Sequence, residues 1–165
     1  MTSILGIDPG LASTGWGVVG VEGNRSRHLA HGTIRTAAGG SLANRLVSVY
    51  EEVLDVVERY APAEAGIEML YFARNTSSAL PVAHARGAIM VALARTGVVC
   101  HEYPPQEIKQ SIVGNGRATK DQVQQMVKLL LGLSDIPKPD HSADALAAAL
   151  CHASHRPLLE QRRVQ

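Results

Sequence analysis

The chain has 165 residues, with 16 Lys and Arg against 15 Asp and Glu, so its formal net charge is only +1. This length suits one domain with a substantial core, which we expect at 1–155, followed by a polar C-terminal tail at 156–165. The small charge excludes a strongly basic protein, so any affinity for nucleic acid must come from a local patch. The longest apolar run, 88–94, is too short to cross a membrane, and no secretion signal is evident, so we expect a cytoplasmic protein.

The first elements we expect are three strands. A short apolar run at 3–8 closes on Pro9-Gly10, and segments rich in Val, Ile and Thr follow at 15–22 and 28–36, between Gly and Asn breaks. Because the connections between them are short, these strands are predicted to pair as consecutive antiparallel neighbours.

A helix and a buried strand come next. Apolar residues recur at helical spacing from Leu42 to Tyr60, behind Ser41, which is a favourable N-cap. The run at 64–70 is too short for a helix and resembles a buried strand. A crossover through the preceding helix would place it parallel to the first strand and beside it.

The remaining segments alternate between helix and strand. Thr119 and Gln122 form a capping box for the fourth helix, and Asp140 can cap the last. The whole order predicts an α/β fold, a mixed five-stranded sheet with helices on both faces. Ligands bind such sheets at the carboxyl ends of strands. The predicted ranges are a helix at 78–95, a strand at 98–103, and helices from 104 to 112, at 120–131 and at 141–153.

Two acids interrupt apolar strands. Asp8 ends the first predicted strand, and Glu68 lies between Ile67 and Met69 in the strand expected beside it. Taken alone, Asp8 could cap the Pro9-Gly10 turn and Glu68 could be structural. Two carboxylates on adjacent buried strands repel each other unless one is protonated or both bind a cation.

The last predicted helix adds a histidine and a third acid. His141 and Asp144 are three residues apart, so both side chains lie on one face of the helix. Alternatively, the acids of this first turn, including Asp140, could have no role beyond stabilising the helix N-terminus. Combined with Asp8 and Glu68, however, they make up the oxygen and imidazole donors that hold Mg²⁺ or Mn²⁺.

Four segments resemble successive motifs of the RuvC family of Holliday junction resolvases, in the same order. The resemblance implies an RNase H-like fold in which Asp8, Glu68, His141 and Asp144 form the catalytic metal-binding set. The family commonly has Asp where this chain has His141, which makes Asp140 a rival for that role. The segments are GIDPGLASTGWGVV (6–19), IEMLYFARNTSSAL (67–80), QEIKQSIVGNGRATKDQVQQMV (106–127) and HSADALAAALCH (141–152).

The resemblance also implies a reaction. The chain would be a crossover junction endodeoxyribonuclease of homologous recombination and DNA repair, with two Mg²⁺ or Mn²⁺ ions in each active site. It would hydrolyse phosphodiester bonds in pairs and leave 5′-phosphate and 3′-hydroxyl nicks. A homodimer is expected from the two-fold symmetry of the junction, and the resemblance implies cooperation with the RuvAB branch-migration complex.

Contacts to DNA are predicted near these motifs. Lys109 and Lys120 lie where the family pattern places lysines close to the scissile phosphate, and Arg74 and Arg117 in adjoining loops could extend the basic surface. Either Tyr71 or Phe72 could stack on an unpaired base at the junction centre, and the resemblance favours Tyr71. The Ala-rich helix at 78–95 is a candidate for the dimer interface, although it could equally pack within the chain.

Three other functions fit parts of the sequence. Asp8-Pro9-Gly10 and Thr14-Gly15 also match the first loop of nucleotide-binding modules of the actin and sugar-kinase type, which normally need two related domains. A DNA-binding module without catalysis would leave the buried acids unexplained. An RNase H-like nuclease could also act on another substrate, such as RNA in a hybrid.

Overall fold

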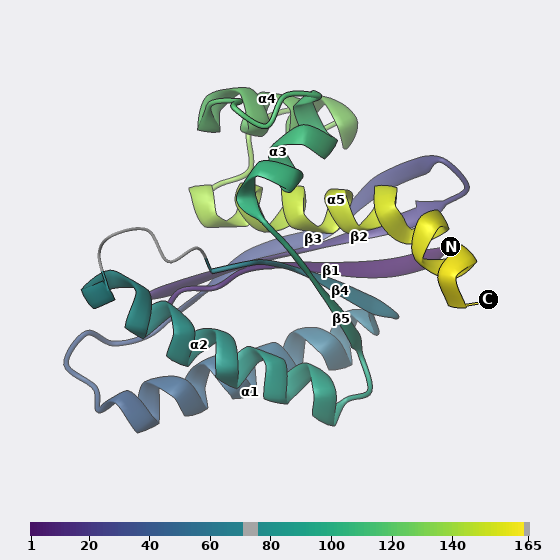
Figure 1. Ribbon diagram of the computed structural model, residues 1–165. Helices are drawn as coiled ribbons and strands as arrows, with labels where there is room; N and C mark the ends of the chain where they lie inside the picture. The colour runs from purple at the N-terminus through teal and green to yellow at the C-terminus, as the bar shows by residue number, and fades with distance from the viewer. Residues whose placement is uncertain (71–75, 164–165) are drawn as a thin grey trace.

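The sheet determines where every functional side chain can lie. The structure is a computed structural model that describes residues 1–70 and 76–163, with the backbone alone at 76–78 and 157–163. Its five strands run in the order β3-β2-β1-β4-β5 (Figure 1). The first three pair antiparallel, whereas β4 is parallel to β1 and β5 is parallel to β4, which confirms the predicted mixed sheet. The strands are β1 (Thr2–Asp8), β2 (Ser13–Glu22), β3 (Arg25–Arg35), β4 (Glu64–Glu68) and β5 (Val99–Tyr103).

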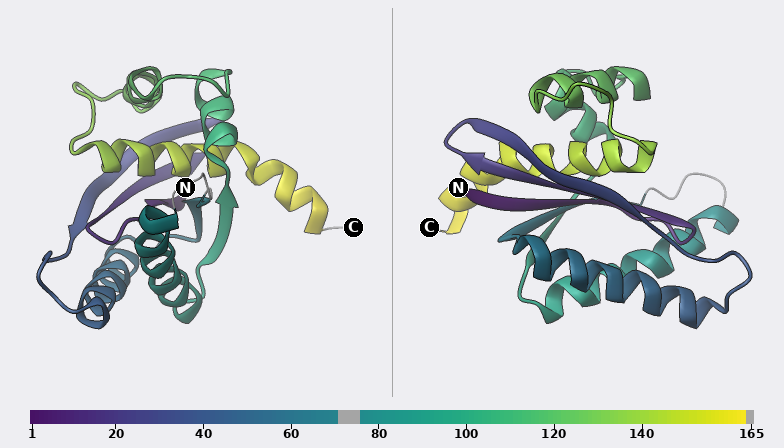
Figure 2. Two further views of the ribbon diagram at one scale, coloured as in Figure 1. Left: turned by 60° about the vertical axis from the view of Figure 1, so that its left-hand side comes forward. Right: turned by 180° about the vertical axis from the view of Figure 1, so that it is seen from behind.

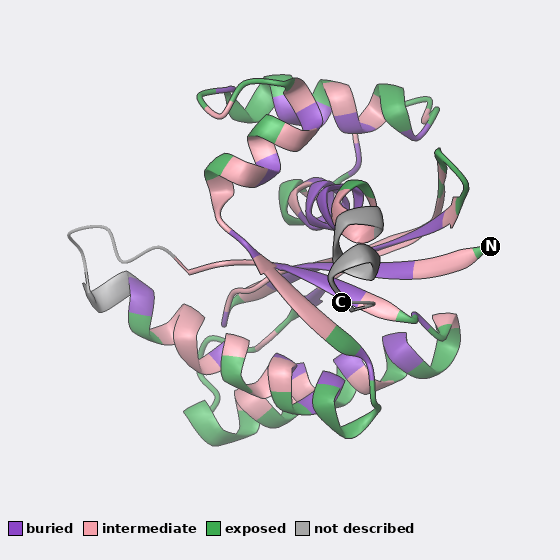
Figure 3. Cartoon of the chain, turned by 45° about the vertical axis from the view of Figure 1, so that its right-hand side comes forward, coloured by how far each residue is buried: buried purple, intermediate pink, exposed green. Residues whose placement is uncertain are grey.

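Helices cover both faces of the sheet. Two lie on one face, α1 (Leu42–Tyr60) and α2 (Thr76–Arg95). On the other face α5 (Asp140–Arg163) lies along the strands, and the shorter α3 (Pro105–Val113) and α4 (Lys120–Leu130) pack over it (Figures 1 and 2). Each face has its own apolar core, and the buried residues lie between the layers while the outer helix turns are exposed (Figure 3).

Side-chain caps set two of the helix starts as predicted. Ser41 caps α1, because its Oγ accepts a hydrogen bond from the backbone N–H of Asn44 at 3.2 Å. Thr119 and Gln122 form the reciprocal capping box of α4, with bonds of 3.3 and 2.9 Å. Each satisfies backbone donors that a helix terminus leaves free.

The last helix differs from its prediction at both ends. Asp140 belongs to the first turn instead of capping it, and the N–H of Ser142 donates to the carbonyl of Pro139 at 2.9 Å. The helix was predicted to stop at residue 153, but it continues to Arg163, through most of the segment expected to be a loose tail. Beyond Pro157, residues 158–163 (LLEQRR) have high helix propensity.

A line of glycines lets α5 approach the sheet closely. A Cβ atom at Gly6 would lie 1.9 Å from the carbonyl oxygen of Ala145, and one at Gly15 would lie 1.9 Å from that of His141. Real Cβ atoms do not approach backbone oxygens so closely, so any larger residue would push α5 away. Because Gly6 and Gly15 have no side chain, the start of α5 can pack directly against the end of β1 and the beginning of β2.

Candidate metal centre

The three predicted acids and His141 meet at one edge of the sheet. Asp8 ends β1 and Glu68 ends β4, and the parallel register pairs Ile7 with Ile67, so the two acids follow side by side. The first turn of α5 passes over the same edge and carries His141 and Asp144. The carboxyl ends of neighbouring parallel strands are where sheets of this kind place their ligands.

The distances bring these side chains into one cluster. Ligand atoms of Asp8, His141 and Asp144 all lie within 4.8 Å of one another. His141 Nδ1 is 2.7 Å from Asp8 Oδ2. Glu68 is not one of these three residues, but it is near enough for Asp8 and Asp144 to raise its pKa. Asp8 is only 16% exposed but His141 is 47% exposed, so the cluster is half-buried and open to solvent on one side.

The cluster has more negative charge than its surroundings stabilise. Burial, followed by the negative charges of Asp8 and Asp144, raises the pKa of Glu68 to about 7. Burial also raises the pKa of Asp144, while the hydrogen bond to Asp8 raises the pKa of His141. Like charges at this separation favour a bound proton or a cation. Carboxylates with one imidazole are donors that fit Mg²⁺ or Mn²⁺, so the residues present fit a divalent ion.

Both predicted lysines reach this cluster. A cavity of about 230 Å³ beside the acids is lined by Glu68, Asp144, Lys109 and Lys120, together with apolar residues of α3, α4 and α5. Lys120 Nζ lies 2.9 Å from Asp144 Oδ2, and the charge of Lys109 opposes the raised pKa of Glu68. Two lysines therefore line the same cavity as the acids, and a phosphate group that entered it would meet both of them.

Other predicted residues lie elsewhere. Arg117 is exposed in the connection between α3 and α4 and does not line the cavity. Asp140, the rival to His141, is exposed and pairs with Lys138 at 3.3 Å and with Lys120 at 3.7 Å, but it is not one of the three residues whose ligand atoms converge. Tyr71, Phe72 and Arg74 lie outside the described residues.

One contributor to the site was not foreseen from the sequence. Ser142 is fully buried next to His141, and its Oγ donates to the carbonyl of Gly32 at 2.9 Å and lies 3.1 Å from Thr33 Oγ1. These contacts tie the first turn of α5 to β3. A serine between two site residues has no distinctive pattern of its own, and only the fold reveals its partners.

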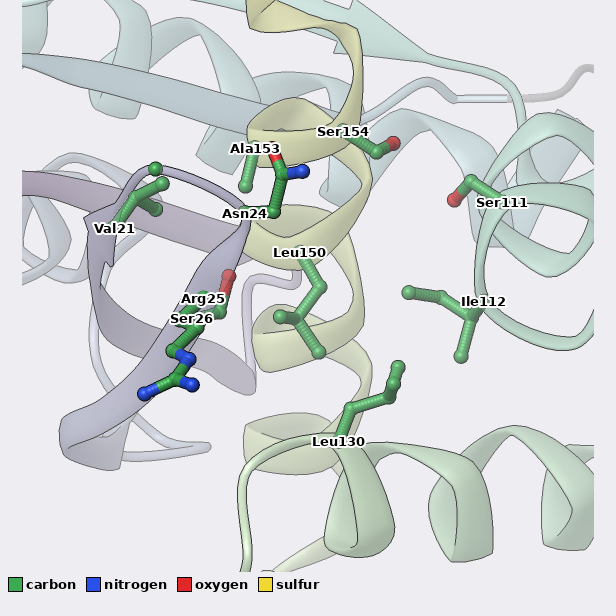
Figure 4. Close-up of a pocket in the computed structure, with 11 residues that line it drawn as sticks. Val21, Asn24, Arg25, Ser26, Ser111, Ile112, Leu130, Leu150, Ala153 and Ser154 are labelled. Carbon is green, nitrogen blue, oxygen red and sulfur yellow. The ribbon is translucent and has the colours of Figure 1, made fainter.

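A wider hollow of about 580 Å³ lies further along α5, between its middle turns and the β2–β3 hairpin. Leu150 of α5, Ile112 of α3 and Leu130 of α4 point into it, and Arg25 lies at its edge (Figure 4). It shares no residue with the cavity at the acids. With mostly apolar walls and one charged lining residue, it lacks the groups that hydrolysis requires.

Comparison with known proteins identifies the family. The family model described as crossover junction endodeoxyribonuclease RuvC matches residues 4–152. A protein of that name from Heliobacterium modesticaldum is 51% identical over 150 residues, which cover 91% of this chain and 93% of the relative. Two solved structures also match across nearly the whole chain.

The first of these structures is T. thermophilus RuvC in complex with Holliday junction substrate, with a TM-score of 0.91 and 36% identity over 96% of each chain. The second, a Thermus thermophilus RuvC structure, has a TM-score of 0.88 and 37% identity over 95% of this chain and 96% of the other. These matches decide against a nucleotide-binding module of the actin and sugar-kinase type and confirm the RNase H-like fold. The chain belongs to the RuvC family of crossover junction endodeoxyribonucleases.

Proposed function

We propose that this chain resolves four-way DNA junctions by hydrolysing paired phosphodiester bonds at the cluster formed by Asp8, Glu68, His141 and Asp144. The observation that carries the proposal is the approach of the Asp8, His141 and Asp144 ligand atoms to within 4.8 Å, with Glu68 at the end of the strand beside that of Asp8. The junction is assigned as substrate because the T. thermophilus relative is described with a Holliday junction substrate. The nicks would carry 5′-phosphate and 3′-hydroxyl ends.

The four side chains would hold two Mg²⁺ or Mn²⁺ ions. Such ions supply a hydroxide nucleophile near neutral pH and neutralise charge on the attacked phosphate. Asp8 lies 2.7 Å from His141 and belongs to the same group as Asp144, so its carboxylate would be a ligand for the bound ions. Glu68 and Asp144 would complete the ligand sets of the ions. His141 would either bind one of the ions or accept a proton. An imidazole among oxygen donors should favour Mn²⁺ over Mg²⁺.

Lys109 and Lys120 would hold the scissile phosphate. Both line the cavity that Glu68 and Asp144 border, so a phosphate there would meet two ammonium groups beside the metal ligands. Lys120 now pairs with Asp144 at 2.9 Å. If that carboxylate held a cation, the ammonium group of Lys120 would be available to a phosphate in the cavity. Tyr71 remains the proposed wedge, and junction cleavage at an unchanged rate by Tyr71→Ala would remove it from that role.

Paired cleavage of a two-fold symmetric junction calls for a homodimer. The outer face of α2 supports a dimer interface, because Leu80 and Val91 are 61% and 60% exposed and lie near Gly87 on one side of the helix. A Cβ at Gly87 would meet no other atom within 4 Å, which leaves room for a second helix. Cooperation with RuvAB and a cytoplasmic location are part of the same proposal. Among the described residues, no helix is both long and apolar enough to cross a membrane.

The test is cleavage of a synthetic four-way junction beside a linear duplex and an RNA–DNA hybrid, each with Mg²⁺ and with Mn²⁺. We expect symmetric nicks in the junction alone, a faster reaction in Mn²⁺, and no cleavage by Asp8→Asn. The matched control is Asp121→Asn, which removes an exposed acid of α4 and should cleave at the wild-type rate.

Two results would contradict the proposal. Tight junction binding without nicks at any metal concentration would indicate a binding module, and preferred cleavage of the hybrid would indicate another substrate. Cleavage by Asp8→Asn with equal rates in both metals would contradict the ligand assignment alone.

A further inference from the structure

Two arginines lie on the β3 side of the sheet, at the end of the sheet that carries the metal centre (Figure 1). Arg35 is the last residue of β3, and Arg45 lies in the first turn of α1. In the strand order, β3 lies on one side of β1 and β4, while β5, which leads into α3 and Lys109, lies on the other. The metal centre therefore lies between Lys109 on one side and these arginines on the other.

The direction of Arg35 follows from its neighbours. Ile34 is buried in the core beneath α1 and α2, and side chains alternate along a strand, so Arg35 points toward the face that α5 covers. Thr33 points the same way, and its Oγ1 lies 3.1 Å from Ser142, the residue next to His141. Residues two apart in a strand are separated by about 7 Å. Arg35 thus lies one such step from a residue that contacts the first turn of α5.

The Arg35 side chain is exposed and unpaired. It makes no hydrogen bond or ion pair with any residue that the structure describes, so its positive charge is not neutralised within that part of the chain. No buried apolar contact requires an arginine at this position. Its charge is available to an external anion.

Arg45 is held in place by a short chain of hydrogen bonds. Its Nε donates to Thr36 Oγ1 at 2.8 Å, and that hydroxyl donates to the carbonyl of Leu11 at 2.6 Å, in the turn that follows Asp8. The two terminal nitrogens of the guanidinium have no hydrogen-bond partner among the described residues. A guanidinium fixed through Nε still presents a planar fork that matches a phosphate.

We propose that Arg35 and Arg45 bind backbone phosphates of the DNA strand on the far side of the scissile bond from Lys109. The inference rests on the proposed function and adds a phosphate-binding surface to it. Two strand spacings separate β3 from β1, about 10 Å, which equals about three base-pair rises measured along the axis of a B-form duplex. The β3–α1 connection and the first turn of α5 lie at the same end of the sheet, and the β2–β3 hairpin lies at the opposite end (Figure 1). A strand crossing the metal centre would reach the arginines without a sharp bend.

The same β-strand provides a matched control. Arg25, its first residue, is also exposed and has no ion pair within the described part of the chain. It lies about 30 Å from Arg35 along the strand, at the hairpin end. Arg25→Gln removes the same charge from the whole protein without touching the proposed surface.

The experiment measures binding of a fluorescent four-way junction by anisotropy in EDTA, from about 50 to 300 mM salt, and cleavage in Mg²⁺. Arg35→Gln and Arg45→Gln should each weaken the Kd about 3- to 10-fold at low salt. The double variant should reduce the slope of log K against log salt by about 2, because each lost phosphate contact contributes about 0.9. The kcat should stay within twofold while KM rises, and Arg25→Gln should match the wild type in every measurement.

Further variants separate charge from folding. Arg45→Lys keeps the charge but loses the Nε bond to Thr36, and we expect it to retain the wild-type salt slope. A loss as large as that of Arg45→Gln would overturn the phosphate role of Arg45 and leave only an anchor for the loop. For Arg35, an unchanged Kd and salt slope in Arg35→Gln, or an equal loss in Arg25→Gln, would overturn the inference.

These results are separable from a failure of the proposed function. A wild-type protein that binds junctions without nicking them would refute the proposed catalysis, yet the salt slopes would still test the arginines. Normal wild-type nicking with no change in the double variant would refute the arginines alone.

Discussion

Two clusters of acids and histidines lie between α5 and the sheet, and they have opposite properties. One is the metal centre at the first turn of α5. The other is three turns further along, where His152 Nε2 contacts Glu64 Oε2 and His152 Nδ1 contacts the Tyr103 hydroxyl, both at 2.7 Å. His152 is fully buried, and Arg156 Nε lies 3.2 Å from the same Glu64 carboxylate.

The difference lies in the balance of charge and in access. Around His152, one acid faces a histidine and an arginine, and both ring nitrogens have partners. Around His141, three acids converge and solvent reaches the imidazole. Burial lowers the pKa of His152, whereas the contact with Asp8 raises that of His141. A histidine–carboxylate pair therefore becomes a candidate metal centre only where acids are in excess and a substrate can enter.

We call the metal centre of Asp8, Glu68, His141 and Asp144 the open cluster. The largest expected effect comes from removing one of its acids. Asp144→Asn should lower junction cleavage in Mg²⁺ on the order of 10³-fold, because a metal ligand and its charge are lost. Its melting temperature should stay the same or rise, since repulsion with Asp8 and Glu68 is relieved. Gel-based cleavage rates and thermal unfolding measure the two effects.

We call the buried cluster of Glu64, Tyr103, His152 and Arg156 the closed cluster. The matched change there is Glu64→Gln. We expect cleavage near the wild-type rate at 25 °C together with a lower melting temperature. If Glu64→Gln lost cleavage while Asp144→Asn kept it, the assignment of the two clusters would be reversed.

Gly15→Ala tests whether the open cluster depends on the close approach of α5. The new Cβ would lie 1.9 Å from the carbonyl oxygen of His141, so the first turn of the helix must move. A displacement of about 1 Å can cost about 10²-fold in rate, and we expect a loss of that order with about 1–3 kcal/mol of destabilisation. Gly39→Ala is the control, since its Cβ would meet no atom within 4 Å. Equal cleavage rates in the two variants would show that α5 can shift without disturbing the ligands.

Much of the open cluster could be predicted from local patterns. The crossover helix placed Glu68 beside Asp8, and helical spacing placed His141 and Asp144 on one face. The contacts that complete the cluster could not be predicted in this way, since they join segments far apart in the chain: Ser142 to Gly32, His141 to Asp8 and Lys120 to Asp144. The glycines at 6 and 15 looked like ordinary strand residues, because nothing local shows that a helix lies against them.

The closed cluster was not predicted at all. Glu64 begins a strand, Tyr103 ends another, and His152 lies near the end of the last predicted helix, so neither spacing nor a shared face connects them. The prediction for the end of α5 was also wrong, because a polar composition does not distinguish a loose tail from an exposed helix, and residues 158–163 favour helix.

Removing His152 from the closed cluster should affect stability more than catalysis. His152→Ala leaves a cavity and takes away a hydrogen-bond partner from both Glu64 and the Tyr103 hydroxyl. We expect a loss of about 2–4 kcal/mol in the free energy of unfolding, measured by urea denaturation. Cleavage at a temperature where the variant is folded should stay within a few fold of the wild type. A strong loss of cleavage by fully folded His152→Ala would show that this cluster also positions the metal ligands.

The smallest expected effect is a pH dependence of stability that belongs to the closed cluster. Burial lowers the pKa of His152, and Arg156 and His101 act in the same direction, while Glu64 opposes them. The folded protein therefore binds a proton at His152 less readily than the unfolded chain, whose histidines titrate near about 6.5. The stabilisation is present above that pH and is lost as the pH falls through the folded-state pKa, by at most about 1.4 kcal/mol per pH unit.

Urea unfolding in EDTA at about pH 7.5 and pH 5.5 should show a smaller drop in the free energy of unfolding for His152→Gln than for the wild type. The partly buried His28 and His31, whose pKa values are also lowered, contribute equally to both proteins, so an equal drop would mean that His152 is not the group that titrates.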